Sequence, residues 1–327
     1  MGAASPSPVS RPAPAALAVV LALGAVYLVW GSTYLGIRFA LEGGWPPFLM
    51  AGLRFIAAGG LMYAVLRLRG VPAPTPGQWR DLAIMGLLLL GLGNGMVCVA
   101  QQTVSSGLAA VAVASCPLWI GLFAAFRGER ATRLEVVGLA IGFAGVAWLN
   151  AGSSLTASPV GLVALLVAPL AWAFGSVWSR GRALPSPFMA AAGQMLCGGV
   201  LLVAGGWLLG ERVEAMPSAR GWLAVAYLAV FGSIVAFSAY AWLLQNVRAS
   251  LLGSYAYVNP VIAVLLGTLL AGERFSAHDL GAMAVILAGV VAITVASARR
   301  RRPVPVHPAA AAADEAVRAE ATPEPRR

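Results

Sequence analysis

The stretch Ser254-Tyr255-Ala256-Tyr257-Val258-Asn259-Pro260 interrupts an apolar run that extends from residue 251 to residue 270. A proline inside a helix removes one backbone donor and clashes with the preceding turn. We therefore expect a kink at Pro260 that leaves backbone carbonyls for neighbouring helices, water or a ligand. The stretch predicts a helix that is broken where something binds.

A shorter counterpart, Ser115-Cys116-Pro117, lies in the middle of the apolar run 107–126. A Gly-Glu-Arg triplet follows each proline, at 128–130 and at 272–274. The tyrosines and the asparagine that precede Pro260 are missing before Pro117. The two breaks therefore correspond in position but differ in chemistry.

The composition indicates an integral membrane protein. Of the 327 residues, 60% are hydrophobic and 10% are charged, and the mean hydropathy is +0.82. An α-helix needs about 20 apolar residues to cross a bilayer, and period-two alternation typical of a membrane barrel is absent. We expect an all-α protein with ten transmembrane helices, at about 15–39, 47–68, 82–101, 107–126, 134–150, 160–179, 187–209, 221–244, 250–270 and 277–298.

The net charge of +10 is explained by topology. The basic residues are all arginines, and they gather at segment ends. With the N-terminus inside, most of them fall in the tails and the even-numbered connections, as the positive-inside rule requires. We therefore predict cytoplasmic termini, with disordered tails at 1–14 and 299–327, and no nucleic-acid partner.

The chain also reads as a duplication, with repeats at 15–151 and 160–298. Residues in the two halves correspond at a spacing of 140 near the start and 144 near the end, as in Pro47-Phe48 with Pro187-Phe188, Gly59 with Gly199, Gly70 with Gly210, and Ala144-Gly145-Val146 with Ala288-Gly289-Val290. Five spans per repeat is an odd number, so the two copies must enter the membrane from opposite sides. An inverted repeat of this kind is typical of alternating-access carriers with a midplane site.

These features resemble the EamA-type transporters of the drug/metabolite transporter superfamily over about residues 15–298. The resemblance rests on the two halves and on the motifs Trp30-Gly31-Ser32-Thr33-Tyr34, Gly93-Asn94-Gly95, Tyr255 to Pro260 and the twin Gly-Glu ends. It implies ten helices, a central cavity, and export of amino acids or related metabolites from a bacterial cytoplasm.

Arg54 is the clearest ionisable residue within a span, seven residues beyond Pro47. A charge deep in a bilayer costs at least about 2.5–3.5 kcal/mol on insertion scales, which makes such a residue a functional candidate. Arg54 either binds a substrate carboxylate through its fork of donors or has a structural role at backbone carbonyls or the interface. No Asp or Glu lies in the middle of any span, which disfavours a proton-driven cation pump.

The remaining candidates are polar, aromatic or helix-breaking residues within or next to the spans. For substrate binding we select, besides Arg54, Ser32, Tyr34, Asn94, Trp119, Trp172, Ser176, Tyr240, Tyr257 and Asn259. As helix breaks or gates we select Pro117, Pro260, Glu129 and Glu273. The two glutamates either order helix ends and pair with arginines or act as gates.

We thus predict a multi-pass carrier of the bacterial inner membrane that exports a small metabolite, an amino acid first among the candidates. The alternative is a multidrug exporter of lipophilic cations, and a sensor or channel-like protein without turnover is a further rival. An intramembrane enzyme is disfavoured, because the only histidines are His278 and His307 and no carboxylate lies in the middle of a span. No metal or cofactor is expected, and the oligomeric state is left open.

Overall fold

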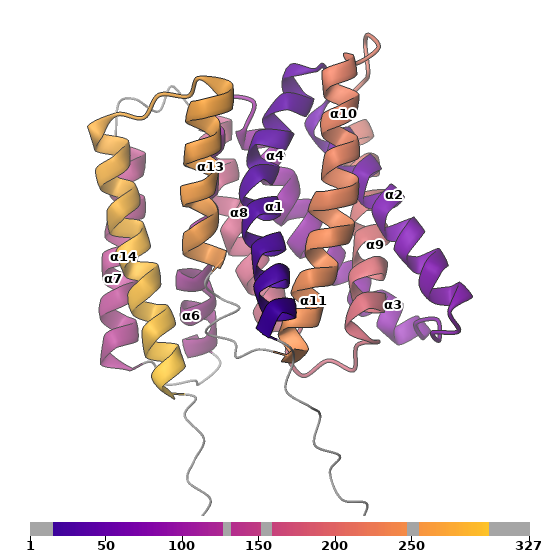
Figure 1. Ribbon diagram of the computed structural model, residues 1–327, viewed down its shortest axis with the longest axis horizontal. Helices are drawn as coiled ribbons and strands as arrows, with labels where there is room; N and C mark the ends of the chain where they lie inside the picture. The colour runs from indigo at the N-terminus through magenta and orange to yellow at the C-terminus, as the bar shows by residue number, and fades with distance from the viewer. Residues whose placement is uncertain (1–15, 127–131, 152–158, 247–254, 301–327) are drawn as a thin grey trace, which may run out of the picture.

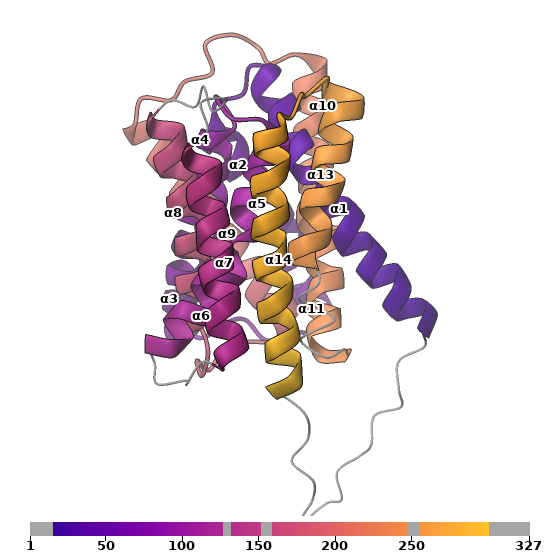
Figure 2. The same ribbon diagram turned by 90° about the vertical axis from the view of Figure 1, so that its left-hand side faces the viewer.

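The computed structural model describes residues 16–126, 132–151, 159–246 and 255–300, and these ranges are helical with no strand. The first half contains α1 (Ala16–Glu42), α2 (Pro47–Leu68), α3 (Pro76–Met85), the π-helix η1 (Gly86–Asn94), α4 (Gly95–Ala100), α5 (Ser106–Ala114), α6 (Cys116–Phe126) and α7 (Arg133–Ala151). The second half contains α8 (Pro159–Trp178), α9 (Pro187–Leu208), α10 (Ala219–Tyr227), the π-helix η2 (Leu228–Val235), α11 (Ala236–Asn246), α13 (Tyr255–Ala271) and α14 (Ala277–Arg300). The helices form one bundle, with the start of α1 and the end of α14 at the same end of it (Figures 1 and 2).

Each predicted apolar segment is mostly helical where the structure describes it, with a turn at Ser115 inside the fourth. Residue 15 of the first segment and residues 250–254 of the ninth lie outside the described ranges. Seven of the described helices are long and apolar enough to cross a membrane, and α13 and α14 contain shorter apolar stretches. The third predicted segment starts earlier than expected, at Pro76. There the Thr75 side chain and the Gln78 side chain form a capping box, and proline suits the first turn of a helix.

The most extensive helix contacts join corresponding helices of the two halves. One such pair is α2 with α9, and glycines let their backbones approach. A Cβ atom added to Gly52 would lie 2.8 Å from the Gly199 carbonyl oxygen, and one added to Gly59 would lie 2.9 Å from that of Ala192. Since the earlier residue of α2 contacts the later residue of α9, the two helices run antiparallel. These contacts also exchange under the spacing of 140, because Gly52 corresponds to Ala192 and Gly59 to Gly199.

The pair α7 and α14 shows the same pattern. A Cβ atom on Gly145 would lie 2.8 Å from the Ile286 nitrogen, and one on Gly289 would lie 2.5 Å from the Gly142 nitrogen. The helices are again antiparallel, and the contacts exchange under the spacing of 144. The two seams lie on opposite sides of the bundle in Figure 1, α7 with α14 at the left and α2 with α9 at the right, and the central helices lie between them.

The third helix of each half is irregular in the same place. η1 interrupts the continuous helix from α3 to α4, and η2 interrupts the one from α10 to α11. Each of these irregular helices packs against a helix of the other half. α8 packs on η1 and α4, and α1 packs on α10 and α11. π-helical turns are frequent at functional sites. We therefore expect a binding site where these irregular helices meet the helices of the other half.

Candidate binding cavity

A cavity lies where these crossing helices meet α13. The space free of protein atoms there is about 920 Å³, including its open mouth. Both halves line it, with α1, α2, η1, α4, α5 and α6 from the first and α8, η2, α11 and α13 from the second. Its polar and aromatic lining consists of Trp30, Thr33, Tyr34, Arg54, Phe55, Asn94, Trp172, Phe237, Tyr255 and Asn259.

Arg54 reaches the cavity from α2 and is 3% exposed. Its Nη2 donates to Oδ1 of Asn94 over 2.6 Å, and its Nε has no hydrogen-bond partner. Among the described residues, no acidic side chain forms an ion pair with Arg54. Its guanidinium also lies over the Phe55 ring, 4.3 Å from the centroid. Among the described residues, this buried cation therefore has a neutral amide and an aromatic ring as its partners.

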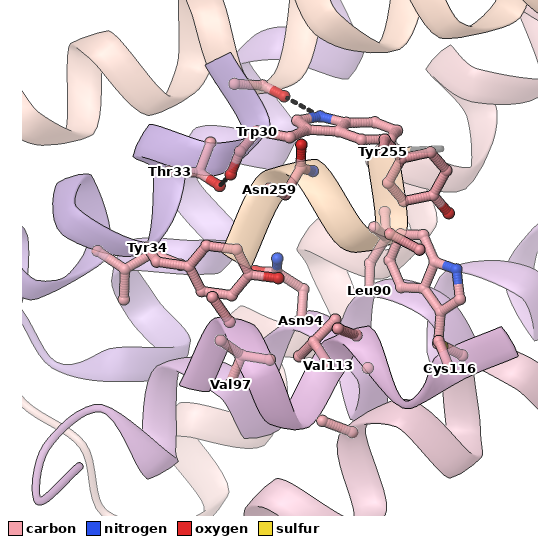
Figure 3. Close-up of a pocket in the computed structure, with 18 of the residues that line it drawn as sticks. Trp30, Thr33, Tyr34, Leu90, Asn94, Val97, Val113, Cys116, Tyr255 and Asn259 are labelled. Carbon is pink, nitrogen blue, oxygen red and sulfur yellow. Dashed lines mark hydrogen bonds between the residues drawn. The ribbon is translucent and has the colours of Figure 1, made fainter. Parts of the chain in front are cut away.

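Asn94 is the last residue of η1, and its neighbour Gly93 allows the helix backbone to lie against a ring. A Cβ atom on Gly93 would be 3.1 Å from the Trp172 ring. In Figure 3 Asn94 and Asn259 enter the cavity from different helices, and the Tyr34 ring lies beside Asn94. The π-helical end thus places an amide where Arg54 can bind it.

Asn259 and Pro260 form the α13 side of the cavity. Asn259 is 5% exposed, and its Oδ1 has no hydrogen-bond partner. Pro260 lies inside the helix and lacks the N–H that would bond to the Ala256 carbonyl four residues earlier. Ala256 itself lines the cavity, so this wall presents a free amide oxygen and a carbonyl without its α-helical donor.

Trp30 organises the aromatic side of the cavity. Its ring centroid lies 5.1 Å from that of Tyr240 and 5.3 Å from those of Phe237 and Tyr255. Its Nε1 donates to the Gly232 carbonyl in η2 over 3.2 Å, the bond drawn in Figure 3. α1 is therefore joined to α11, α13 and η2 through one side chain.

Several predicted binding residues lie elsewhere. The Ser32 hydroxyl pairs with the Tyr227 hydroxyl over 2.6 Å, and the Ser176 hydroxyl donates to the Trp172 carbonyl in its own helix over 2.7 Å. Tyr240 is behind the lining, packed on Trp30 and Tyr255. Neither serine nor Tyr240 is among the residues that line the cavity.

Trp119 packs edge-on against Phe143, with ring centroids 4.5 Å apart, and does not line the cavity. Pro117 is the second residue of α6, just after the interruption at Ser115 that ends α5. The Tyr257 side chain and all of Glu129 lie outside what the structure describes. The predicted set that lines the cavity is therefore Tyr34, Arg54, Asn94, Trp172, Asn259 and Pro260.

The predicted site did not include Trp30, Phe55, Phe237 or Cys116, which also line the cavity. For Trp30 the sequence does hold a signal. Trp30, Thr33, Tyr34 and Ile37 follow the spacing of one helix face, and all four line the cavity. For Phe55, Phe237 and Cys116 no pattern separates them from ordinary packing residues.

Glu273 lies between α13 and α14, at the end of the bundle opposite the start of α1 (Figure 1), and it joins three helices. It accepts hydrogen bonds from the Ser106 nitrogen at 2.8 Å, the Ser106 hydroxyl at 2.7 Å and the Gly107 nitrogen at 3.1 Å, all at the start of α5. Arg38 of α1 donates to it over 2.6 Å. Burial raises the pKa of the Glu273 carboxyl, but the hydrogen bonds from Ser106, Arg38 and Gly107 outweigh it and hold the pKa below its ordinary value.

Glu211 connects two helices in the same way as Glu273. Gly210 and Gly272 end α9 and α13 in the left-handed conformation, with φ of 83° and 64°. The residue after Gly210, Glu211, accepts hydrogen bonds from the Phe48 and Leu49 nitrogens at 3.0 and 2.9 Å. A carboxylate at a helix N-terminus stabilises the unpaired amides there, so both glutamates hold the end of one helix to the start of another.

A bundle of apolar helices around a polar and aromatic cavity defines a membrane transporter. The EamA-like transporter family matches the chain twice, over residues 16–151 and 159–295, and the chain belongs to this family. The family-level prediction made from the motifs is therefore confirmed.

Named relatives agree with this class. The chain is 49% identical over 275 residues to the uncharacterized inner membrane transporter YedA of Escherichia coli (strain K12), covering 84% of this chain and 90% of that protein. It is 26% identical to the uncharacterized transporter YvbV of Bacillus subtilis (strain 168), covering 85% and 92%. A crystal structure 27% identical in sequence superposes with a TM-score of 0.62 over 85% of this chain and 98% of that one.

Proposed function

We propose that the protein is a carrier of the bacterial inner membrane that exports a small metabolite, an amino acid first among the candidates, by alternating access through the cavity. The observation that carries this proposal is the cavity itself, which both halves line and where Arg54, Asn94 and Asn259 lie among aromatic rings. An amino acid with an apolar or aromatic side chain has two charged groups and an apolar body, and this lining offers partners to each. The inner-membrane location of YedA supports the same location here.

We further propose that the ten predicted helices form two inverted repeats of five. The support is the antiparallel packing of α2 on α9 and of α7 on α14, with contacts that exchange under the repeat spacing. A twofold axis perpendicular to the helices relates such pairs, and rocking of one half against the other then exposes the cavity to each side in turn. With the arginine distribution, this arrangement favours cytoplasmic termini.

Glu273 is proposed as part of the outer gate. It connects Arg38 of α1 to the start of α5, and Arg38 also bonds to Glu42 over 2.7 Å. The Ser218 nitrogen donates to the Gly43 carbonyl over 2.8 Å at the same end of α1. These contacts join helices of both halves on the outer side, so we expect them to separate when the cavity opens outward.

Counterflow in proteoliposomes tests the proposal. Vesicles holding the purified protein are loaded with unlabelled amino acids, and entry of each labelled amino acid is followed against protein-free vesicles. Saturable entry that requires internal amino acid supports a carrier. Entry of lipophilic cations, with no amino acid entering, would replace this proposal with the multidrug alternative.

A further inference from the structure

The charged group that lines the cavity indicates which chemical class of cargo it binds. Arg54 is the charged side chain among the described lining residues, and it is buried with an unpartnered Nε. A buried cation without a counter-ion is unfavourable in a membrane interior. Its two close partners, Oδ1 of Asn94 and the Phe55 ring 4.3 Å from Cζ, are both neutral and do not cancel the charge. This part of the cavity therefore suits an anionic group.

The other polar groups of the cavity are neutral. Asn259 offers an unpartnered Oδ1, and Thr33 donates its hydroxyl to the Trp30 carbonyl over 2.6 Å. No aspartate or glutamate is among the described residues that line the cavity. A ligand ammonium group would therefore meet amide oxygens and aromatic faces, which bind it more weakly than a carboxylate does.

We propose that the cargo is an organic carboxylate whose anionic oxygens bind Arg54, and that a cargo ammonium group is dispensable. This inference rests on the proposed carrier function and narrows its substrate class to carboxylates with an apolar or aromatic body, amino acids included. The body lies against the rings of Trp30, Tyr34, Trp172 and Tyr255, which come from α1, α8 and α13 around the cavity. Arg54 thus selects a cargo that carries a negative charge.

The first test compares matched ligands on the purified, full-length protein. The phenyl set is L-phenylalanine, 3-phenylpropanoate and phenethylamine, and the aliphatic set is L-leucine, 4-methylpentanoate and isopentylamine. Ligand binding to the folded state raises the thermal midpoint of unfolding. We expect a carboxylate of at least one set to raise the midpoint with or without its ammonium group, and the matched amine to have no effect. Equal stabilisation by the amine, or none by any carboxylate, overturns the proposal.

The second test replaces the cation. In Arg54→Gln the affinity for the carboxylate should fall roughly 10- to 100-fold, the size expected for loss of a charged hydrogen-bond partner, and Arg54→Lys should recover part of it. Arg69→Gln removes an exposed arginine just past the end of the same helix and is the matched control. Unchanged affinity in Arg54→Gln contradicts the proposal.

The stability of the ligand-free variant separates binding from a structural role. If Arg54 serves to bind an anionic cargo and not to stabilise the fold, ligand-free Arg54→Gln should unfold at the same temperature as the unmodified protein or at a higher one. The reason is that the substitution removes a buried charge that has no counter-ion. A midpoint lowered by several degrees in Arg54→Gln would show instead that the bond to Asn94 holds η1 in place, and would overturn the assignment.

Counterflow then distinguishes this inference from the proposed function. Binding that depends on Arg54 without any counterflow would reject the carrier and leave the carboxylate site standing. Counterflow of a cargo that Arg54→Gln transports equally well would reject the carboxylate site and leave the carrier standing.

Discussion

The two halves of the protein share their packing and differ in their polar residues. At the α2 and α9 seam, Gly52 and Gly59 meet Gly199 and Ala192 in contacts that the repeat exchanges. Two residues after Gly52 the two halves differ, because Arg54 corresponds to Gln194. Arg54 faces the cavity, whereas Gln194 is 7% exposed, has an unpartnered Oε1 and does not line the cavity.

The two helix breaks predicted at prolines also differ. The predicted break at Pro260 was wrong, since α13 continues through this residue beside the cavity-lining Asn259, whereas α5 ends before Ser115 and Pro117 is the second residue of α6. The Ser115 hydroxyl bonds to the Ala112 carbonyl over 2.6 Å and so closes the end of its own helix. The two halves thus keep the same helix contacts at the seams, whereas only one residue of each of these corresponding pairs lines the cavity.

Moving the charge to the other half should have the largest effect. Gln194→Arg places a cation in a buried position away from the cavity, and we expect it to lower the free energy of unfolding by about 3 kcal/mol. Gln194→Leu, of similar volume, is the control and should fold normally. Thermal unfolding in detergent measures both, and a stable Gln194→Arg protein would show that the two positions are interchangeable after all.

The symmetric seams should be nearly as sensitive. Gly289→Ala brings Cβ to 2.5 Å from the Gly142 nitrogen, and Gly145→Ala brings it to 2.8 Å from the Ile286 nitrogen. We expect each to destabilise the protein by about 1–3 kcal/mol through overpacking. Gly205→Ala in α9, where nothing lies within 4 Å of the added atom, is the control. Seams that tolerate both alanines would not be tightly packed.

Glu273 should make stability depend on pH. The pKa of its carboxyl is lower in the folded protein than its ordinary value near 4.5. The stability it contributes is therefore present above pH 4.5 and is lost as the pH falls through the folded pKa. Glu273→Gln should cost about 1–3 kcal/mol at pH 7 and should flatten the acid dependence. An acid profile identical to that of the unmodified protein would assign that dependence to other groups.

The smallest effect on transport is expected at Trp119. Trp119→Phe keeps the ring packed on Phe143 and lies outside the cavity lining, so cargo affinity should change less than about twofold. Trp172→Phe is the matched change at a lining residue and should weaken binding more. Counterflow at several cargo concentrations measures both, and the reverse order would move the site toward α6.

The sequence predicted the helices well, because length, apolarity and prolines at helix starts such as Pro47 and Pro187 are local signals. Which way a side chain faces is decided by packing between helices. Arg54 and Asn259 proved to line the cavity, but Trp119 turned to Phe143 and Ser176 bonded to its own helix. The π-helices η1 and η2 were not predicted from the sequence.

Counterflow of a labelled carboxylate by the unmodified protein and by Arg54→Gln tests the account most directly. We predict saturable entry that requires unlabelled carboxylate inside the vesicles, is not inhibited by the matched amine, and falls at least tenfold at low cargo concentration in the variant. Entry that is equal into loaded and empty vesicles, or equal for the two proteins, would contradict the account.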